Sequence, residues 1–344
     1  MQITPEIKAQ LAEQKKECPF CKIVTKEIPS KIVFEDSHTL ALLDIYPALK
    51  GHTLFLPKEH YPIMPYLPEE ERIHFFGILP QLAKAVKSAL VTVSVQIFIA
   101  NGGLAGQQSA HFMIHLLPRD EGDGFLNFLL SKKKDNLSAE KSIPISRPFL
   151  TMVNSYFHSH PFSWHQGTGS TPSFLQEIKA ENIIVYEDEK SLVILPQKCS
   201  VPGQIEIYSK TEEKYLENLS AEECTHLFHL ASLAASSLFE GLKAQGTNIL
   251  VKSGKTDDHK EGKLCWYILP RMPDDSLQGV LWERKQPKYD LDGVASKIKD
   301  KSWKVKYLPQ KKEEVKVKTT PTENHSKPKT IQEEIAEAIK KMKG

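Results

Sequence analysis

The chain has 344 residues, of which 40% are apolar and 26% charged, and its formal net charge is +2 at pH 7. These values are typical of a globular protein of about two domains, and they exclude a disordered chain or one with a strong charge bias toward nucleic acid. Because no apolar run could span a membrane and residues 1–16 lack the apolar core of a secretory signal, we expect a cytoplasmic protein with no membrane contact.

The first third of the chain alternates short strands with two helices. Thr4, Pro5 and Glu6 open a charged helix over residues 4–16, since proline is favoured in the first turn. A longer helix runs from Pro68 to about Leu90, with apolar residues at helical spacing. The predicted strands are residues 31–35, 39–43, 52–57, 93–100 and 110–117.

The last of these strands carries unusual side chains. Alternate residues of a strand share a face, so His111, Met113 and His115 should project together, and Pro118 should end the strand. One interpretation is a half-buried strand with two hydrogen-bonded histidines. The other is an anion site, because the glycine-rich turn of residues 101–107 lets backbone N–H groups approach a phosphate.

The second half of the chain repeats the first. Phe34-Glu35-Asp36 matches Tyr186-Glu187-Asp188, Gly51 matches Gly203, and Leu117-Pro118-Arg119 matches Leu269-Pro270-Arg271, always 152 positions later. Chance would not keep this register, so we predict two related units. The long helix should recur from Ser220 to about Leu242.

Two segments lie outside the repeat. Residues 131–169 read as a linker or loop, and their histidine cluster at residues 158–165 is either a surface feature or a flap over a ligand pocket. Residues 310–344 are rich in Lys, Glu, Thr and Pro, which predicts a disordered tail. Thr330 begins a pattern typical of a capping box, so the tail should end in a short helix that is a candidate docking segment for a protein partner.

From Cys18 to about Phe125 the chain resembles the histidine-triad (HIT) family of nucleotide-binding hydrolases and transferases. Six motifs in the family's order carry the resemblance: Cys18-Pro19-Phe20-Cys21, Asp44-Ile45-Tyr46-Pro47, Gly51-His52, Pro57-Lys58-Glu59-His60, Ala105-Gly106-Gln107 and the His-x-Met-x-His-Leu-Leu run that begins at His111. The resemblance implies an α+β fold of two HIT-like units, each an antiparallel sheet of about five strands with helices, packed as an intrachain pseudo-dimer and hence a monomer. The expected divisions are residues 1–17 (N-terminal helix), 18–130 (first unit, with the sites), 131–169 (linker), 170–309 (degenerate second unit) and 310–344 (tail).

By the same resemblance, the first unit should bind a purine nucleotide or another nucleoside phosphate. The implied contacts are Asp44 to the ribose hydroxyls, His52 and His115 near the phosphates, and Asn101, Gly106 and Gln107 in the glycine turn. The family's nucleophile is the middle histidine of the triad, and here that position is Met113, which has no proton to exchange and forms no stable phosphoryl intermediate. This favours a nucleotide sensor or scaffold with weak or no hydrolysis. The alternative is an active hydrolase or nucleotidyltransferase acting on a phosphoramidate or a dinucleoside polyphosphate, because His52 and His115 are retained.

Cys18 and Cys21 have the spacing of two ligands to one metal. Zinc-containing relatives complete such a site with histidines at the positions of His60 and His111, so the resemblance implies one structural Zn²⁺ per chain. The second unit replaces the two cysteines and the two histidines, which predicts no metal there. The four replacements are Ser170, Ser173, Glu212 and Lys263. Cys265 stands at its nucleophile position between Leu264 and Trp266, which favours an inert core cysteine.

Overall fold

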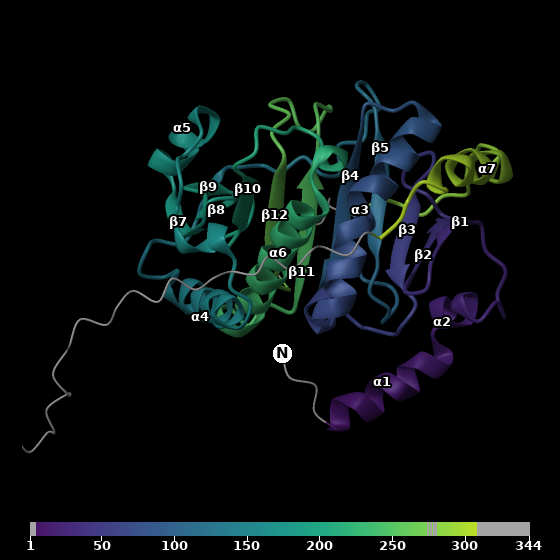
Figure 1. The fold of residues 1–344 in the computed structure, drawn as a ribbon, viewed down its shortest axis with the longest axis horizontal. Helices are drawn as coiled ribbons and strands as arrows, with labels where there is room; N and C mark the ends of the chain where they lie inside the picture. Colours follow the sequence, from purple (N-terminus) through teal and green to yellow (C-terminus); the bar gives the residue numbers. More distant parts are fainter. Residues whose placement is uncertain (1–4, 274, 276, 278–280, 308–344) are drawn as a thin grey trace, which may run out of the picture. The chain divides into compact units, whose positions relative to one another are not determined.

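A computed structural model describes residues 5–307 except 274, 276 and 278–280 (Figure 1). The predicted tail, its helix and its docking role lie outside the described residues, as do residues 1–4 of the N-terminal segment. Among the helices of the described part, none is long and apolar enough to cross a membrane.

One antiparallel sheet of ten strands runs through both units, in the order β1-β2-β3-β5-β4-β11-β12-β10-β8-β7. The strands are β1 (Ile32–Glu35), β2 (Thr39–Leu43), β3 (Thr53–Pro57), β4 (Ser94–Asn101), β5 (Ile114–Arg119), β7 (Ile183–Glu187), β8 (Ser191–Leu195), β10 (Ile205–Ser209), β11 (Gly246–Lys252) and β12 (Cys265–Arg271). A separate two-stranded ribbon pairs β6 (Lys134–Asp135) with β9 (Lys198–Cys199). The units join at the centre, where β4 pairs antiparallel with β11 and Ile99 lies opposite Ile249. This seam confirms the expected pseudo-dimer of two five-stranded halves.

The helices of one layer cover one face of this sheet (Figure 1), and they are α3 (Glu69–Leu90), α4 (Ile143–Ser159), α6 (Ala221–Gly241) and α7 (Leu291–Ser302). α2 (Pro19–Val24) and α5 (Ser173–Glu181) pack against apolar clusters on the opposite face, and α1 (Pro5–Glu17) precedes α2. The short 3-10 turns are η1 (Met64–Tyr66), η2 (Gly103–Ala105), η3 (Ser163–Gln166) and η4 (Leu216–Asn218). The recurrence of the long helix is confirmed, because α3 and α6 lie side by side over the middle of the sheet. Phe76 of α3 and Phe228 of α6 are 152 positions apart and stack with ring centroids 4.3 Å apart. The two units therefore share one core at their junction.

The same pairing of side chains recurs at the C-terminal end of the last sheet strand of each unit, β5 and β12. Arg119 donates from Nε to Asp123 at 2.6 Å, and Arg271 donates from Nε to Asp275 at 2.5 Å. Both arginines are buried, so these charge-assisted hydrogen bonds fix the chain where it leaves β5 and β12. The offset of 152 positions in the sequence is thus a repeat of side-chain contacts as well as of strands.

The interpretation of residues 131–169 as a linker or loop was wrong, because the segment contains α4. Phe149, Val153 and Phe157 recur every four residues on one side of α4 and are buried in the core between the helices and the sheet. Pro144 and Pro148 obscured this helix in the sequence. Pro144 lies in the first helical turn, where the N–H groups have no intrahelical partner, whereas Pro148 lies inside the helix, where its missing N–H costs one backbone hydrogen bond.

Each unit also lends a helix to the other. α4, which follows the first unit, packs against α6 of the second. α7 follows the second unit yet packs against α3 and β1 of the first, where Ser302 Oγ donates to the carbonyl of Val33 at 2.5 Å. Boundaries at residues 170 and 309 separate the units along the sequence. In the fold, however, α4 and α7 each pack on the unit to which they do not belong in sequence.

The triad strand differs from its expected limits of residues 110–117. β5 begins at Ile114, because the N–H of Phe112 bonds to the carbonyl of Tyr61, outside the sheet ladder. It continues through Pro118 because the pairing of β5 with β3 stops at Leu116, so beyond that point the strand has one neighbour and the missing N–H leaves no gap in the ladder. His111 therefore precedes the strand that carries His115.

Candidate functional site

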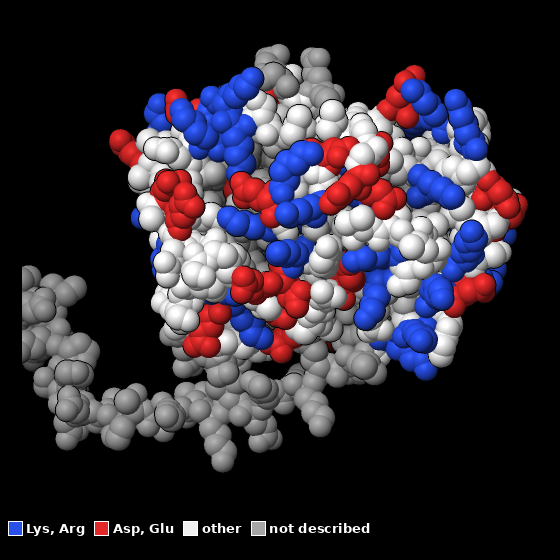
Figure 2. Space-filling view, turned by 90° about the horizontal axis from the view of Figure 1, so that it is seen from above, with Lys and Arg blue, Asp and Glu red and all other residues white. Residues whose placement is uncertain are grey.

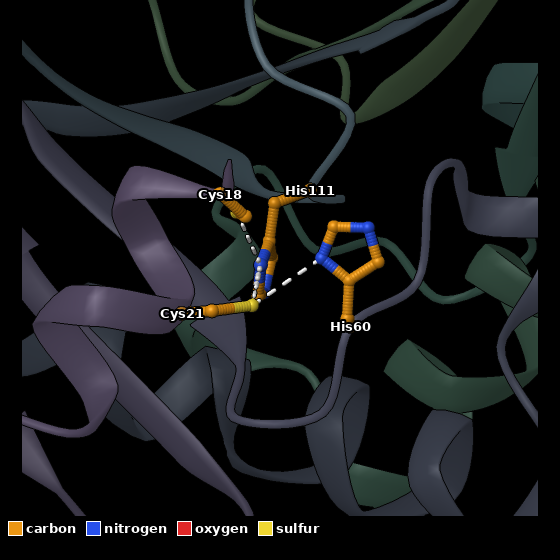
Figure 3. Close-up of side chains that lie close together, drawn as sticks. All are labelled: Cys18, Cys21, His60 and His111. Carbon is orange, nitrogen blue, oxygen red and sulfur yellow. Dashed lines mark hydrogen bonds between the residues drawn. The ribbon is translucent and has the colours of Figure 1, made fainter. Parts of the chain in front are cut away.

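Four side chains from three separate segments meet at the start of the first unit (Figure 3). Cys18 caps α2 and Cys21 lies within it, while His60 follows β3 and His111 precedes β5. Sγ of Cys21 lies 3.3 Å from Nδ1 of His60 and 3.6 Å from Nδ1 of His111. Sγ of Cys18 lies 3.5 Å from Nδ1 of His111. All four residues are buried, and their ligand atoms lie within 4.8 Å of one another.

The surrounding hydrogen bonds prepare this group for a cation. Nε2 of His111 donates to the carbonyl of Pro57 at 2.8 Å, which leaves the Nδ1 lone pair facing the two sulfurs. Burial opposes ionisation of Cys18, but the interactions of its sulfur with His111 and His60 outweigh burial and lower the pKa of this thiol to about 4. Burial and the neighbouring Cys18 thiolate raise the pKa of Cys21 to about 12. Two sulfurs and two imidazole nitrogens converging in a buried site form the donor set of a closed tetrahedral Zn²⁺ centre, so the residues fit the metal that the sequence predicts.

A second group lies on the face of the sheet opposite the helical layer. Nε2 of His52 lies 2.9 Å from Nδ1 of His115, and Nδ1 of His52 lies 3.4 Å from a carboxylate oxygen of Asp44. The N–H of Ala48 donates to Nδ1 of His52 at 3.2 Å, which places the proton of His52 on Nε2. His52 then donates to His115, whose own proton must sit on Nε2. The relay ends in a neutral imidazole N–H donor on His115.

Burial fixes the charge of this pair. It lowers the pKa of His52 to about 3, and it lowers the pKa of His115 to about 3 with a further contribution from His52. Both imidazoles are therefore neutral at pH 7. Asp44, His52 and His115 also lie close enough to hold a metal ion. Their nitrogens are already engaged with each other and with Ala48, so we interpret the group as a hydrogen-bonded relay.

An aromatic side chain of the second unit covers this relay, although no sequence motif points to it. The ring of Trp282 meets His52 edge-on at 5.2 Å and His115 at 5.3 Å between centroids. Beside it, Leu281 lies against Gly106, where an added Cβ would come within 2.4 Å of the leucine side chain. Trp282 lies far from every motif in the sequence, so no pattern marks it as part of a site. The equivalent position in the repeat, 152 residues earlier, is Leu130.

Two side chains of the glycine turn, Asn101 and Gln107, are held by hydrogen bonds within the protein. Asn101 is fully buried; it accepts from the N–H of Met64 and donates to Thr247 of the second unit. Gln107 accepts from the N–H of Gly102 at 2.7 Å and donates to the carbonyl of Pro62 at 2.5 Å. Both side-chain amides therefore brace the turn. Any contact they make to a ligand would have to replace one of these bonds.

Met113 and the outer histidines do not form one continuous triad. Met113 is half-buried and packs against an apolar cluster on the relay's face of the sheet, formed by Leu40, Leu42, Leu54 and Leu56. His115 lies on this face opposite Leu54, whereas His111 belongs to the cysteine group. His111 thus serves a different group from His115, because it lies before β5 and close to Cys18 and Cys21. The histidine cluster after α4 is no flap over this site: His160 pairs with Glu69 and His165 with Tyr186 in the helical layer.

The second unit lacks both groups. Within the described residues, the two His/Cys/Asp/Glu clusters that could hold a metal both belong to the first unit. Cys265 is fully buried and burial raises the pKa of its thiol, as expected for an inert core cysteine.

Comparisons with known proteins agree with the repeat. The family profile described as the HIT domain matches residues 25–122 and again 177–271, together more than half of the chain. An uncharacterized HIT-like protein of Methanocaldococcus jannaschii is 44% identical over 107 residues, which are 31% of this chain and 82% of that protein. The adenosine 5'-monophosphoramidase of Saccharomyces cerevisiae is 38% identical over 110 residues, 32% of this chain and 67% of that protein.

A solved structure matches both units at once. The ADP-glucose phosphorylase of Arabidopsis thaliana, solved with bound ADP-glucose, superimposes with a TM-score of 0.51 over 83% of this chain and 90% of that chain. The sequences are 15% identical, so this likeness concerns the fold alone. It extends the similarity from single units to the arrangement of two units in one chain.

Proposed function

Because the chain belongs to the family built on the HIT domain, we propose that its first unit binds a nucleoside phosphate with little or no turnover, as a sensor or scaffold. The observation that carries the proposal is the neutral His52–His115 relay under Trp282, next to a methionine where the family places its nucleophile.

The relay suits binding of a phosphate better than chemistry on it. A neutral imidazole N–H on His115 donates a hydrogen bond to a phosphate oxygen without needing a proton from solvent. Asp44 keeps one carboxylate oxygen on the N–H of Tyr46 at 2.8 Å and has further lone pairs for ribose hydroxyls. Neither residue attacks phosphorus, and the thioether of Met113 has no activated lone pair that forms a stable phosphoryl intermediate.

The second candidate is an active hydrolase or nucleotidyltransferase. Retention of Asp44, His52 and His115 in one hydrogen-bonded group favours it, as does the 38% identity to a protein named as an adenosine 5'-monophosphoramidase. In that case water or a second substrate would attack directly, with His115 as proton donor to the leaving group.

One experiment separates the two candidates. The full chain is titrated calorimetrically with AMP, GMP and UMP, and the same sample is assayed for hydrolysis of a nucleoside phosphoramidate. We expect binding of at least one nucleotide and turnover far below about 1 s⁻¹, the lower end for ordinary enzymes. Met113→His should raise hydrolysis, whereas Met113→Leu, which keeps the apolar packing on Leu54, should not. Wild-type turnover at enzymatic rates would instead establish the second candidate.

We also propose one structural Zn²⁺ per chain, held by Cys18, Cys21, His60 and His111. A closed site of four protein ligands would tie α2 to the loops around β3 and β5. Elemental analysis of purified protein should give one zinc, and Cys18→Ser with Cys21→Ser should remove it. The control is Cys224→Ser in the second unit, which should leave the zinc content unchanged. Zinc that survives the double substitution would place the metal elsewhere.

A cytoplasmic, monomeric protein completes the proposal. All five cysteines, which lie within the described residues, are free, as expected of a reducing compartment. The seam between β4 and β11 already supplies the interface that would otherwise need a second chain.

A further inference from the structure

The second unit has a pocket at the position where the first unit has its relay. The pocket has a volume of about 220 Å³ and is lined by Tyr267 and Leu130 among others. Tyr267 is 152 positions after His115, and Leu130 is 152 positions before Trp282. Each site is therefore bordered by a segment of the opposite unit, and the two are equivalent places in the repeated fold.

The chemistry of the two places differs. Four lysines line the second pocket, together with His259 and two carboxylates. The lysines are Lys132, Lys252, Lys260 and Lys263, and the carboxylates are Asp258 and Glu261. The second unit thus has a lysine-rich pocket, with an acidic partner for each lysine, where the first unit has its neutral histidines.

Two of the lysines are neutralised by buried acids. Lys252 lies 3.2 Å from Asp258, and both side chains are buried. Lys132 lies 2.9 Å from Glu206, which also accepts from the hydroxyl of Tyr208 at 2.5 Å. Because Asp258 and Glu206 are engaged with these lysines, they have little capacity left to repel an anion.

The other two lysines, Lys260 and Lys263, are paired loosely. Nζ of Lys263 lies 3.6 Å from Glu261, and Nζ of Lys260 lies 4.0 Å from Asp257, beyond hydrogen-bond length in both cases. Glu261 and Lys260 are largely exposed, so solvent screens their pairs. The two ammonium groups can exchange these partners for a bound anion at small cost.

We infer that this pocket of the second unit binds a phosphate-bearing small molecule, with Lys260 and Lys263 as the exchangeable cations. Pockets that enclose drug-sized ligands measure about 300–1,000 Å³, so about 220 Å³ suits a phosphate or a short phosphate chain better than a whole dinucleotide. A long polyanion fits less well. Figure 2 looks onto the end of the sheet where the loop between β11 and β12 lies, and there basic and acidic side chains are interspersed rather than forming a continuous basic stripe.

The test is a calorimetric titration of the full chain with inorganic pyrophosphate at low salt. We expect Lys260→Gln with Lys263→Gln to weaken binding at least about 10-fold, since each ammonium forms charge-assisted hydrogen bonds with phosphate oxygens. Lys297→Gln with Lys299→Gln on α7 makes the same change in net charge at exposed positions and should leave the affinity unchanged.

A second arm repeats the titrations with AMP. If both lysine substitutions weaken AMP and pyrophosphate equally, the pocket holds the phosphate end of a nucleotide; if they weaken pyrophosphate alone, it holds free phosphates. The inference is overturned if wild type binds no pyrophosphate, or if the α7 control weakens binding as much as the Lys260 and Lys263 substitutions.

Discussion

Phe76 and Phe228 offer the sharpest test that the two units fold as one. Their rings are fully buried, stack at 4.3 Å with an interplanar angle of 10°, and come from equivalent positions of α3 and α6. Replacing a buried phenylalanine by alanine costs about 3–5 kcal/mol. We therefore expect Phe76→Ala and Phe228→Ala each to lower the free energy of unfolding by about this amount, a large share of the roughly 5–15 kcal/mol typical of native proteins.

The coupling between the two rings is measured separately with leucine, which keeps most of the volume but removes the stack. Aromatic pairs contribute about 0.5–1.5 kcal/mol beyond their buried area, so the double substitution to leucine should cost less than the two single ones together by that amount. Urea unfolding is followed by circular dichroism and by tryptophan fluorescence. A control pair, Phe55 and Phe75, stacks at 4.2 Å inside the first unit.

We expect a single unfolding transition, whose midpoint either substitution shifts as a whole. If Phe228→Ala shifted one of two separate transitions and left the other at its wild-type midpoint, the junction would not be a shared core. Strict additivity of the two leucine substitutions would show that the rings are neighbours without mutual stabilisation.

Two further predictions concern the relay. Burial lowers the pKa of His52 and His115 to about 3, whereas the histidines of an unfolded chain titrate near 6.5. Below pH 6.5 the unfolded chain therefore binds more protons than the folded chain. The free energy of unfolding should be constant above about pH 7 and fall by roughly 1.4 kcal/mol per histidine per pH unit below 6.5. Urea midpoints between pH 7.5 and 5.5 measure this, and a flat profile would mean that the imidazoles are charged or exposed in the native state. Trp282→Ala should speed acylation of His52 and His115 by diethyl pyrocarbonate, because it uncovers both rings. Trp303→Ala, at an exposed position, is the matched control, and equal rates in the two variants would show that Trp282 does not limit access.

The sequence predicted the repeated fold because the repeat carries its own register. Arg119 and Arg271 occupy matching positions, and each holds an aspartate four residues later. The four residues of the cysteine group were also predictable, since ligand spacing and a family resemblance both pointed to them. The structure brings them within 4.8 Å of one another.

The sequence was less informative where tertiary contacts decide the local conformation. The start of β5 depends on a hydrogen bond between Phe112 and Tyr61, which are far apart in the chain and carry no strand or turn signal. α4 was hidden by two prolines, whose effect depends on their position within the helix. Trp282 was missed because its role exists only once the second unit lies beside the first.

The exchange of segments explains why a unit without the histidine relay is retained. α7 completes the helical layer of the first unit, and Trp282 covers its relay, yet both belong to the sequence of the second unit. In return, α4 packs on α6, and Leu130 lines the pocket of the second unit. Deleting either half would therefore expose the core of the other as well as the seam along β4 and β11. The second unit is thus needed for the fold of the first. The pocket of the second unit does not have to form the relay, so its lining can be rich in lysine instead.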